Sequence, residues 1–337
     1  MSMAAAASMS AAFVETANGP FVVHELARPE PGPGQVLVKI AASGLNPLDA
    51  KIRAGQAGHA RQPLPAVLGI DMAGTIEALG EGVAQWQPGD EVFGMVGGVG
   101  GRQGTLAQYV AVDASLLARR PAALSPREAA ALPLIAITAW EGLMDRAKVQ
   151  AGQRVLVHGG AGGVGHIAVQ LARAQGAQVW ATGRAAQAQT LEALGAAPID
   201  SAATSVESYV QQATGGAGFD VVFDTLGGAT LDASFAAVRR YTGHVVSILG
   251  WGAHSLAPLS FRGATYSGVF TLLPLLTGEG LAHHGEILRA VSKLADEGLL
   301  RPRLDERRFA GLHEAGAAHE LMTGGGARGK IVLDLTP

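Results

Sequence analysis

The sequence predicts an α/β protein in which a small β-rich domain accompanies a doubly wound parallel sheet. Three observations support this fold class. Short strand-like runs separated by Gly and Pro fill the first third of the chain, strands alternate with helices in the middle, and a glycine-rich turn joins a buried strand to a helix. The 337 residues suffice for about two domains, and the 48% hydrophobic content allows a large core.

Strand-like patterns in the first third occur at residues 11–14, 21–24, 35–41, 73–79, 91–95 and 108–112. Gly and Pro residues at 29–34 form a turn between the second and third strands, and residues 97–104 form a loop. Met1 to Ser10 has no basic cluster before an apolar run, so it does not have the pattern of a signal peptide. It is expected to be a leader without regular structure or an artificial extension.

The middle of the chain begins with a helix opened by Ser125, with Pro126 at its first position and Glu128 three residues after the cap. Strands are expected at residues 155–158, 178–182, 221–224 and 245–249, and helices at 165–175 and 188–194. This alternation is typical of a parallel, doubly wound sheet.

The tail from about Gly278 holds two amphipathic helices and a last strand, residues 331–335. No helix follows that strand, so it is expected to return to the β-rich domain. The predicted division is therefore 11–125 for the first part of the β-rich domain, 126–272 for the doubly wound domain, and 273–337 for the return.

Composition excludes several classes of function. The net charge is −3 and no basic stripe is present, so nucleic acids and anionic membranes are poor partners. The chain has no cysteine, which excludes disulfides, thiolate catalysis and cysteine-bound metals, and fits a cytoplasmic protein. No apolar run reaches membrane-spanning length, because the best one, residues 269–276, is short and broken by Pro274.

A phosphate-binding loop is predicted after the strand at 155–158. Gly160, Gly162 and Gly165 satisfy G-x-G-x-x-G between a strand and a helix. Glycines allow the tight turn, the approach of a pyrophosphate to the backbone, and close packing of helix and strand, and the helix N-terminus offers free N–H groups. The alternative is a glycine-rich turn without a ligand.

The next strand indicates which nicotinamide cofactor binds. NAD sites carry an acidic residue near the end of this strand, where it holds the ribose hydroxyls. Here the strand ends with Thr182, Gly183 and Arg184, which offers a guanidinium for a 2′-phosphate and no carboxylate. This favours NADPH, unless Arg184 is only a solvated loop residue.

Several segments resemble, in order and spacing, those of the zinc-free quinone oxidoreductases related to zeta-crystallin, a branch of the medium-chain dehydrogenase/reductase superfamily. Residues 43–51 (SGLNPLDAK) are similar to their GVNxxD segment, and residues 68–74 (LGIDMAG) to their GxDxxG segment. The QPGDEV turn, the AITAW segment, the glycine loop and the final GKIV follow in order. The resemblance covers the chain from about Ala11 onward.

The resemblance implies a GroES-like catalytic domain and a Rossmann domain, with NADPH in the cleft between them and, often, a homodimer. It places Asn46 and Asp49 near the nicotinamide as catalytic candidates. Together with the glycine motif it predicts these cofactor-binding residues: Thr138, Gly160, Gly162, Gly163, Val164, Gly165, Thr182, Arg184, Leu249, Gly250, Val269, Phe270 and Lys330. The chain departs from some relatives in lacking a tyrosine at residues 199–201, where Ser201 is a weak substitute, and an aromatic residue shortly after Asn46.

No metal site is expected. The positions that match zinc ligands of related alcohol dehydrogenases are Asn46, Ile70 and about Leu134, and an amide is a poor zinc ligand. Without a Lewis acid, alcohol oxidation is disfavoured. His313 and His319 are six residues apart and His283 and His284 are adjacent, so these four are expected to be loop or surface histidines.

The predicted reaction is hydride transfer from NADPH to a small-molecule quinone or α,β-unsaturated carbonyl compound, an enone or enal. Asn46 would donate a hydrogen bond to the carbonyl oxygen, although the Asn-Pro pair is also a common turn. The proton would come from water, with Asp49 and Lys51 as further candidates. A different class, an NADPH-binding structural or regulatory protein with little turnover, stays open.

Two other aspartates have structural interpretations. Asp71 is expected to be a buried carboxylate that accepts structural hydrogen bonds. Asp224 ends a parallel strand, so it either borders the cofactor cleft or caps the next turn.

Overall fold

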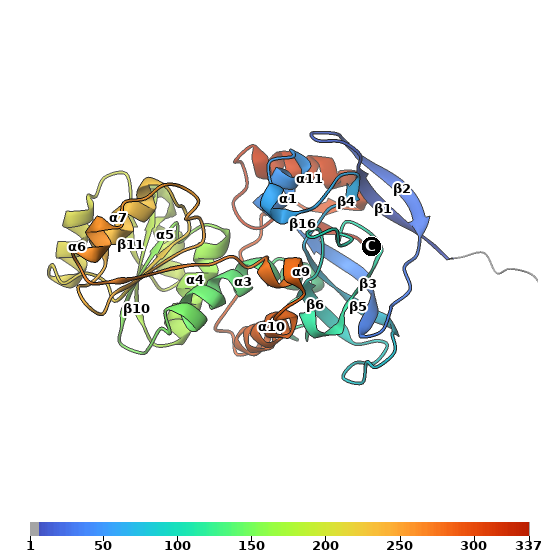
Figure 1. Ribbon diagram of the computed structural model, residues 1–337, viewed down its shortest axis with the longest axis horizontal. Coiled ribbons are helices and arrows are strands. Elements are labelled where there is room, and N and C mark those ends of the chain that lie inside the picture. Colours follow the sequence, from blue (N-terminus) through green and yellow to red (C-terminus); the bar gives the residue numbers. More distant parts are fainter. Residues whose placement is uncertain (1–6, 337) are drawn as a thin grey trace, which may run out of the picture. The chain divides into compact units, whose positions relative to one another are not determined.

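The computed structural model describes residues 7–336, which form two compact units (Figure 1). Unit 1 holds the chain up to Leu134 and again from Leu272, and unit 2 holds Ile135–Thr271. Helix α2 (Pro126–Ala130) belongs to unit 1, although the sequence analysis assigned it to the Rossmann domain. Arg127 fixes this helix to unit 1, because its Nη1 donates to Val332 O at 3.0 Å and to Asp334 Oδ2 at 2.8 Å. Among the described residues, no helix is both long and apolar enough to cross a membrane.

Unit 1 is built on two sheets. The smaller one has the order β2 (Phe21–Ala27), β1 (Ser8–Val14) and β4 (Ala66–Val67). The larger one has the order β15 (Phe309–Ala310), β16 (Val332–Asp334), β3 (Gln35–Gly44), β5 (Asp71–Leu79), β6 (Glu91–Met95) and β8 (Leu117–Arg119), and β7 (Tyr109–Asp113) pairs with β3. The six strands predicted for this region are confirmed, with small shifts at their ends.

The expectation for the N-terminal segment is wrong for its last residues. Ser8, Met9 and Ser10 begin β1 and pair with Ala27, Leu26 and Glu25 of β2. Met9 is buried, so this part of the segment is held by the sheet. The prediction for Met1–Ala6 falls outside the described residues.

The last strand returns to unit 1 as predicted. β16 pairs antiparallel with β3, with Val332 opposite Gly44. The helices and short helical turns of this unit are α1 (Pro47–Arg53), η1 (Gly58–Ala60), η2 (Ala114–Leu116), α2, α9 (Leu273–Thr277), α10 (Leu281–Asp296), η5 (Leu312–Glu314) and α11 (Ala315–Thr323). Ser125 caps α2 as predicted, since its Oγ accepts from Glu128 N at 3.3 Å and its own N donates to Glu128 Oε2 at 2.9 Å.

Two of the four histidines expected at the surface are buried instead. His284 of α10 is 0% exposed, and His319 of α11 is 1% exposed and packs on the Phe21 ring with 4.7 Å between centroids. Each lies on the apolar face of its amphipathic helix, which faces the sheet layers of unit 1. His283 and His313 are exposed, as expected.

Unit 2 is a six-stranded parallel sheet of doubly wound order. Its strands follow the order β11 (Ala197–Asp200), β10 (Gln178–Gly183), β9 (Arg154–His158), β12 (Val221–Asp224), β13 (His244–Ser247) and β14 (Thr265–Gly268). The helical segments are α3 (Pro133–Trp140), whose first two residues fall in unit 1, the π-helix η3 (Glu141–Arg146), α4 (Gly163–Ala174), η4 (Ala185–Gln187), α5 (Ala188–Ala193), α6 (Val206–Thr214), α7 (Ala229–Ala237) and α8 (Ala257–Ser260). The strand order reverses between β9 and β12, and doubly wound sheets bind ligands beyond the carboxyl ends of the strands at this point.

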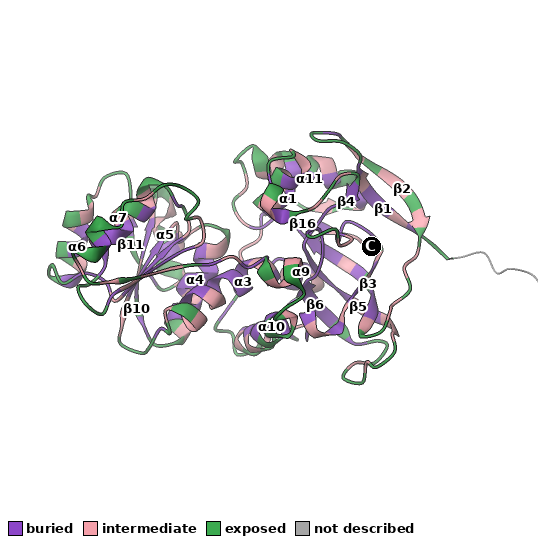
Figure 2. Ribbon diagram, in the orientation of Figure 1, coloured by how far each residue is buried: buried purple, intermediate pink, exposed green. Residues whose placement is uncertain are grey.

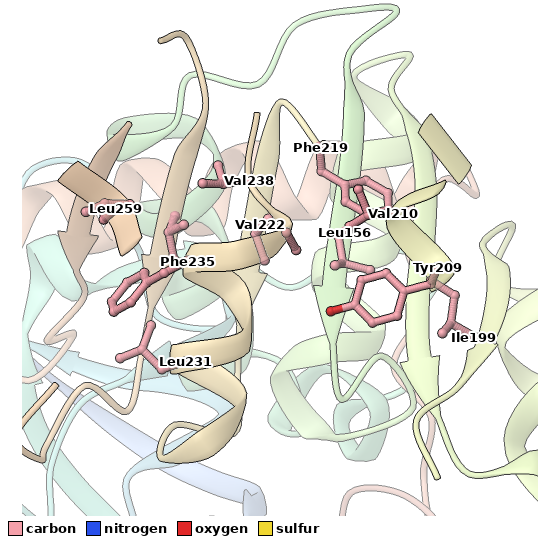
Figure 3. Close-up of a cluster of buried hydrophobic side chains, with 12 residues drawn as sticks. Leu156, Ile199, Tyr209, Val210, Phe219, Val222, Leu231, Phe235, Val238 and Leu259 are labelled. Atoms are coloured by element: carbon pink, nitrogen blue, oxygen red, sulfur yellow. The ribbon is translucent and has the colours of Figure 1, made fainter. Parts of the chain in front are cut away.

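The core of unit 2 lies between the sheet and the helices on one of its faces. Phe219, Tyr209 and Phe235 pack there with aliphatic side chains from β9, β12 and α7 (Figure 3). Trp180 of β10 meets Phe219 edge-on at 5.7 Å between ring centroids. The central strands of both units are buried while the outer faces of the helices are exposed (Figure 2). Each large apolar side chain buried in this way contributes about 1.5–3 kcal/mol.

Candidate functional site

The glycine loop of unit 2 is shaped by close backbone contacts. Gly159 has φ +68°, a conformation that favours glycine. A Cβ on Gly165 would lie 2.1 Å from Gly159 O, and one on Gly160 would lie 2.5 Å from the Ala181 Cβ. These positions therefore need glycine for the fold of the loop itself.

The packing of the loop does not require glycine at Gly163 and requires it only weakly at Gly162. Both are exposed, and a Cβ on Gly162 would meet only Gly159 O at 3.1 Å, while one on Gly163 would meet only Ile135 at 3.8 Å. Gly162 precedes α4, a twelve-residue helix whose first N–H groups have no partner within the helix. The loop thus leaves an open cradle in front of a helix N-terminus, which fits the pyrophosphate of a dinucleotide.

A threonine of the next strand fastens this loop. Thr182 Oγ1 accepts from Gly159 N at 3.1 Å and lies 3.1 Å from His158 Nδ1, and Gly160 N donates to Thr182 O at 3.0 Å. Burial lowers the pKa of His158 to about 4, so the imidazole is neutral at pH 7. His158 has no local signal in the sequence for this role, since its contact depends on the pairing of two strands.

The end of β10 carries no carboxylate. Arg184 follows the strand with an exposed side chain, and its backbone N donates to Gln187 Oε1 at 2.9 Å. Ser201 is engaged with the backbone, because its Oγ donates to Gly183 O at 3.1 Å. A cationic side chain is therefore the group available at the position where NAD sites hold an acidic residue.

Asp224 caps a turn, as one of its two interpretations predicted. It is fully buried and accepts hydrogen bonds from Leu226 N, Gly227 N and the Ser247 hydroxyl, at 2.8–3.1 Å. The Ser247 hydroxyl in turn accepts from Leu249 N at 3.1 Å. These bonds join the ends of β12 and β13.

The remaining expected cofactor residues of unit 2 lie at or near the same end of the sheet. Val269 N donates to Ser247 O at 3.0 Å, and Gly250 follows Leu249 with an exposed backbone. Phe270 meets the Trp251 ring edge-on at 5.9 Å between centroids. The Thr138 hydroxyl is 3.0 Å from that of Thr271, which donates to Glu141 Oε2 at 3.1 Å.

The catalytic candidates of unit 1 belong to a buried polar cluster, which consists of Asn46, Asp49, Asp71 and Lys330. Asn46 Nδ2 donates to Asp71 Oδ2 at 3.0 Å, and Asn46 N donates to Asp49 Oδ2 at 2.8 Å. The Lys330 ammonium donates to Asn46 Oδ1 and, at 2.6 Å, to Leu45 O. Asp71 Oδ1 accepts from Leu134 N at 2.9 Å, which confirms Asp71 as a buried hydrogen-bonded carboxylate.

Burial dominates the electrostatics of this cluster. It raises the pKa of Asp49 to about 7 and that of Asp71 to about 6, with the Asp71 charge adding to the shift at Asp49. The Lys330 ammonium acts in the opposite direction on both carboxyl groups. Burial also lowers the pKa of Lys330, whereas the two carboxylates raise it. Two acids and one base thus share a buried site.

The positions that match zinc ligands hold no metal-binding set. Ile70 is aliphatic and fully buried, and Leu134 contributes its backbone N–H to Asp71. Within residues 7–336, no group of three or more His, Asp or Glu side chains is arranged to hold a metal ion.

The structure brings together Asn46, Asp49 and Lys330 in unit 1, and the glycine loop with Thr182 in unit 2. Lys330 was expected near the cofactor, and its ammonium lies on the Asn46 amide. Sequence reasoning did not foresee this contact, since the two residues are 284 positions apart.

Fold and site together define an oxidoreductase with a GroES-like unit and a Rossmann unit. Residues 32–122 match the alcohol dehydrogenase GroES-like domain, and residues 194–333 match the family described as zinc-binding dehydrogenase. The chain is 34% identical to the 2-methylene-furan-3-one reductase of Solanum lycopersicum, covering 90% of this chain and 72% of that protein. It is 33% identical to the chloroplastic NADPH-dependent alkenal/one oxidoreductase of Arabidopsis thaliana, covering 90% and 73%.

Solved structures agree with this assignment. An alcohol dehydrogenase superfamily protein from Novosphingobium aromaticivorans is 60% identical, with a TM-score of 0.95 and coverage of 97% of this chain and 99% of that one. The quinone oxidoreductase from Coxiella burnetii is 29% identical, with a TM-score of 0.81 and coverage of 98% and 100%. The chain belongs to the medium-chain dehydrogenase/reductase superfamily, as the sequence resemblance indicated.

Some relatives are far longer than this chain. It is 37% identical over 281 residues to a pikromycin polyketide synthase component from Streptomyces venezuelae, of which it spans 7%.

Proposed function

We propose that this protein reduces quinones or α,β-unsaturated carbonyl compounds with NADPH and without zinc. The observation that carries the proposal is the Asn46 amide, which is held between Lys330 and Asp71 at a position where related dehydrogenases have a zinc ligand. An oriented N–H donor stabilises negative charge on a carbonyl oxygen. Such charge develops on the oxygen when an enone or a quinone accepts a hydride.

The residues of unit 2 fit a nicotinamide dinucleotide. Gly160, Gly162, Gly163, Val164 and Gly165 would hold its pyrophosphate, since the cradle at Gly162 and Gly163 is open and a helix N-terminus faces it. When bound, NADPH supplies the hydride.

The two ends of the cofactor have separate groups of residues. Thr182 and Arg184 would face the adenosine end, where the exposed guanidinium suits a 2′-phosphate. The nicotinamide end would be lined by Thr138, Leu249, Gly250, Val269 and Phe270.

The side chains at the matching positions support the proposed zinc independence. An amide, an isoleucine and a leucine do not provide the thiolate and imidazole donors that zinc prefers. The segment matched by the zinc-binding dehydrogenase family, residues 194–333, includes none of Asn46, Ile70 and Leu134.

Protonation of the reduced substrate is assigned to water or to Asp49. The Asp49 carboxyl group lies beside Asn46, and its pKa of about 7 lets it carry a proton near neutral pH. Together the two residues supply a hydrogen bond to the developing oxyanion and a proton source next to it.

The test is NADPH oxidation with 1,4-benzoquinone and with cyclohex-2-enone, beside NADP reduction with small alcohols, each with and without EDTA. We expect turnover with at least one carbonyl acceptor, no effect of EDTA, and very poor alcohol oxidation. Product analysis then distinguishes an enone reductase from a quinone reductase. Alcohol oxidation that exceeds acceptor reduction and is lost with EDTA would contradict the zinc-free assignment. NADPH binding without turnover of any acceptor would favour a structural or regulatory role.

We also propose a homodimer formed through unit 2. β14 is at the edge of the sheet, and the nearby Tyr241 and Phe261 are 84% and 85% exposed. An unpaired strand edge beside large exposed aromatic rings is a surface that a second copy can cover. Light scattering coupled to size exclusion tests this, and a monomeric mass at micromolar concentration would contradict it.

A further inference from the structure

Lys330 is held firmly in unit 1 by its own backbone. Lys330 N donates to Arg303 O at 2.7 Å, and Asp305 N donates to Lys330 O at 3.0 Å. The side chain is 6% exposed, and its ammonium lies between Leu45 O and Asn46 Oδ1. A buried ammonium destabilises the fold unless it donates its protons to acceptors, and these two oxygens are its acceptors here.

The Asn46 amide has only one orientation that satisfies its neighbours. Its oxygen faces the ammonium of Lys330 and its nitrogen faces the carboxylate of Asp71. A flipped amide would set its NH2 against the ammonium and its oxygen against the carboxylate. Asp71 is itself fixed by Leu134 N at 2.9 Å, so both anchors of the amide are rigid.

Asn46 is 1% exposed, and one N–H of its amide is left for a ligand once the surrounding atoms give access to it. Nδ2 carries two hydrogens, and Asp71 accepts one of them. The Lys330 contact on Oδ1 draws electron density away from the amide nitrogen, which makes the remaining N–H a stronger donor. Hydrogen bonds in series strengthen one another in this way, and more so where the local dielectric is low.

We propose that Lys330 is a positioning residue for carbonyl reduction, which orients and polarises the Asn46 amide so that its free N–H stabilises the oxyanion of the reduced substrate. The inference rests on the proposed function. Lys330 thereby provides a fixed positive charge behind the donor, whereas a zinc ion would contact the oxygen itself.

The test uses Lys330→Gln, because glutamine retains an N–H donor, on a side chain one bond shorter, and removes the charge. With the acceptor that the wild type reduces best, we expect kcat to fall about tenfold while the Kd for NADPH changes less than about twofold. Lys293→Gln is the matched control, since Lys293 is an exposed lysine of α10 in the same unit, and it should leave both values unchanged.

A double-mutant cycle shows whether Lys330 acts through Asn46. Asn46→Ala should lower kcat by about 10²-fold, the usual loss for one oxyanion donor. The Asn46→Ala/Lys330→Gln double variant should be no slower than Asn46→Ala alone, because the charge has nothing left to polarise. Losses that multiply would overturn the proposal, as would a Lys330→Gln kcat within twofold of the wild type.

Infrared difference spectroscopy adds a readout that does not depend on turnover. Carbonyl-labelled cyclohex-2-enone bound with NADP should show a lowered C=O stretching frequency in the wild type, a smaller shift in Lys330→Gln and none in Asn46→Ala. An equal shift in wild type and Lys330→Gln contradicts the polarising role. A wild type that reduces no acceptor would overturn the proposed function and this inference together, whereas an active wild type with an unaffected Lys330→Gln variant overturns this inference alone.

Discussion

Replacing Asp49 by asparagine should change how the stability of the protein depends on pH. The Asp49 carboxyl group has a pKa of about 7 in the folded protein, against 3.8 for the ordinary group, and burial is the main cause. Between these two values the unfolded chain has lost the proton while the folded protein keeps it. The folded state therefore binds more protons, and the free energy of unfolding decreases as the pH rises.

The size of the effect follows from the two pKa values. A group whose pKa is raised from 3.8 to about 7 costs about 4 kcal/mol once the pH exceeds both values, and nothing below pH 3.8. Asparagine does not titrate, and its Oδ1 still accepts from Asn46 N. The difference in unfolding free energy between Asp49→Asn and the wild type should thus shift by about 4 kcal/mol toward the variant between pH 4 and pH 8.

The assay is urea unfolding followed by circular dichroism at four pH values between 4 and 8. If the new NH2 group destabilises the fold by a constant amount, it lowers the unfolding free energy equally at all four pH values. Only the slope of the unfolding free energy against pH therefore tests the prediction. Asp90→Asn is the flat control, because Arg119 holds the pKa of Asp90 below its usual value, so this carboxyl group is ionised in both the folded and the unfolded state over most of the range from pH 4 to pH 8. A difference between Asp49→Asn and wild type that stays within 1 kcal/mol from pH 4 to pH 8, or that shifts toward the wild type, would refute the reasoning.

Two further predictions concern the cofactor unit. Gly162→Ala should fold normally and lower NADPH affinity at least about tenfold, measured by fluorescence titration. Gly165→Ala should instead lower the melting temperature, because its Cβ would meet Gly159 O at 2.1 Å. Gly316→Ala, in open space on α11, is the control for both variants. Arg184→Glu should weaken NADPH more than NADH by about 1–3 kcal/mol, since it places a carboxylate against the 2′-phosphate. Arg146→Glu makes the same charge change on an exposed residue of unit 2, and an unchanged NADPH/NADH ratio in Arg184→Glu would show that Arg184 does not contact the phosphate.

Features coded by nearby residues could be predicted from the sequence. The Ser125 cap and the glycine loop each depend on residues within one turn, and both lie where expected. β14 was missed because its four residues, TYSG, are half-buried or exposed and show no apolar alternation. Its place in the sheet comes from pairing with β13, which no local pattern encodes.

The buried histidines could have been predicted from helical periodicity. His319 lies four residues after the buried Ala315, and His284 lies three and four residues before the buried Ile287 and Leu288. These spacings of three and four residues define the apolar stripe of an amphipathic helix. The expectation of surface histidines relied on residue type where the periodicity was the stronger signal.

The Asn46 cluster is costly to the fold, and this cost bears on its role. Burial raises the pKa of Asp49 and Asp71 and lowers that of Lys330, so each group is less stable in its charged form here than in water. Apolar side chains of similar size usually fill such a site with equal or greater stability. Stability therefore does not account for two acids and a base around one amide. The cluster does hold a single N–H donor in one orientation, which is what carbonyl reduction without a metal requires. The same reasoning applies to Asp49→Asn. Relative to the wild type, this variant should gain stability between pH 4 and pH 8 and should still be a poorer enzyme. Variants that relieve strain at an active site trade activity for stability.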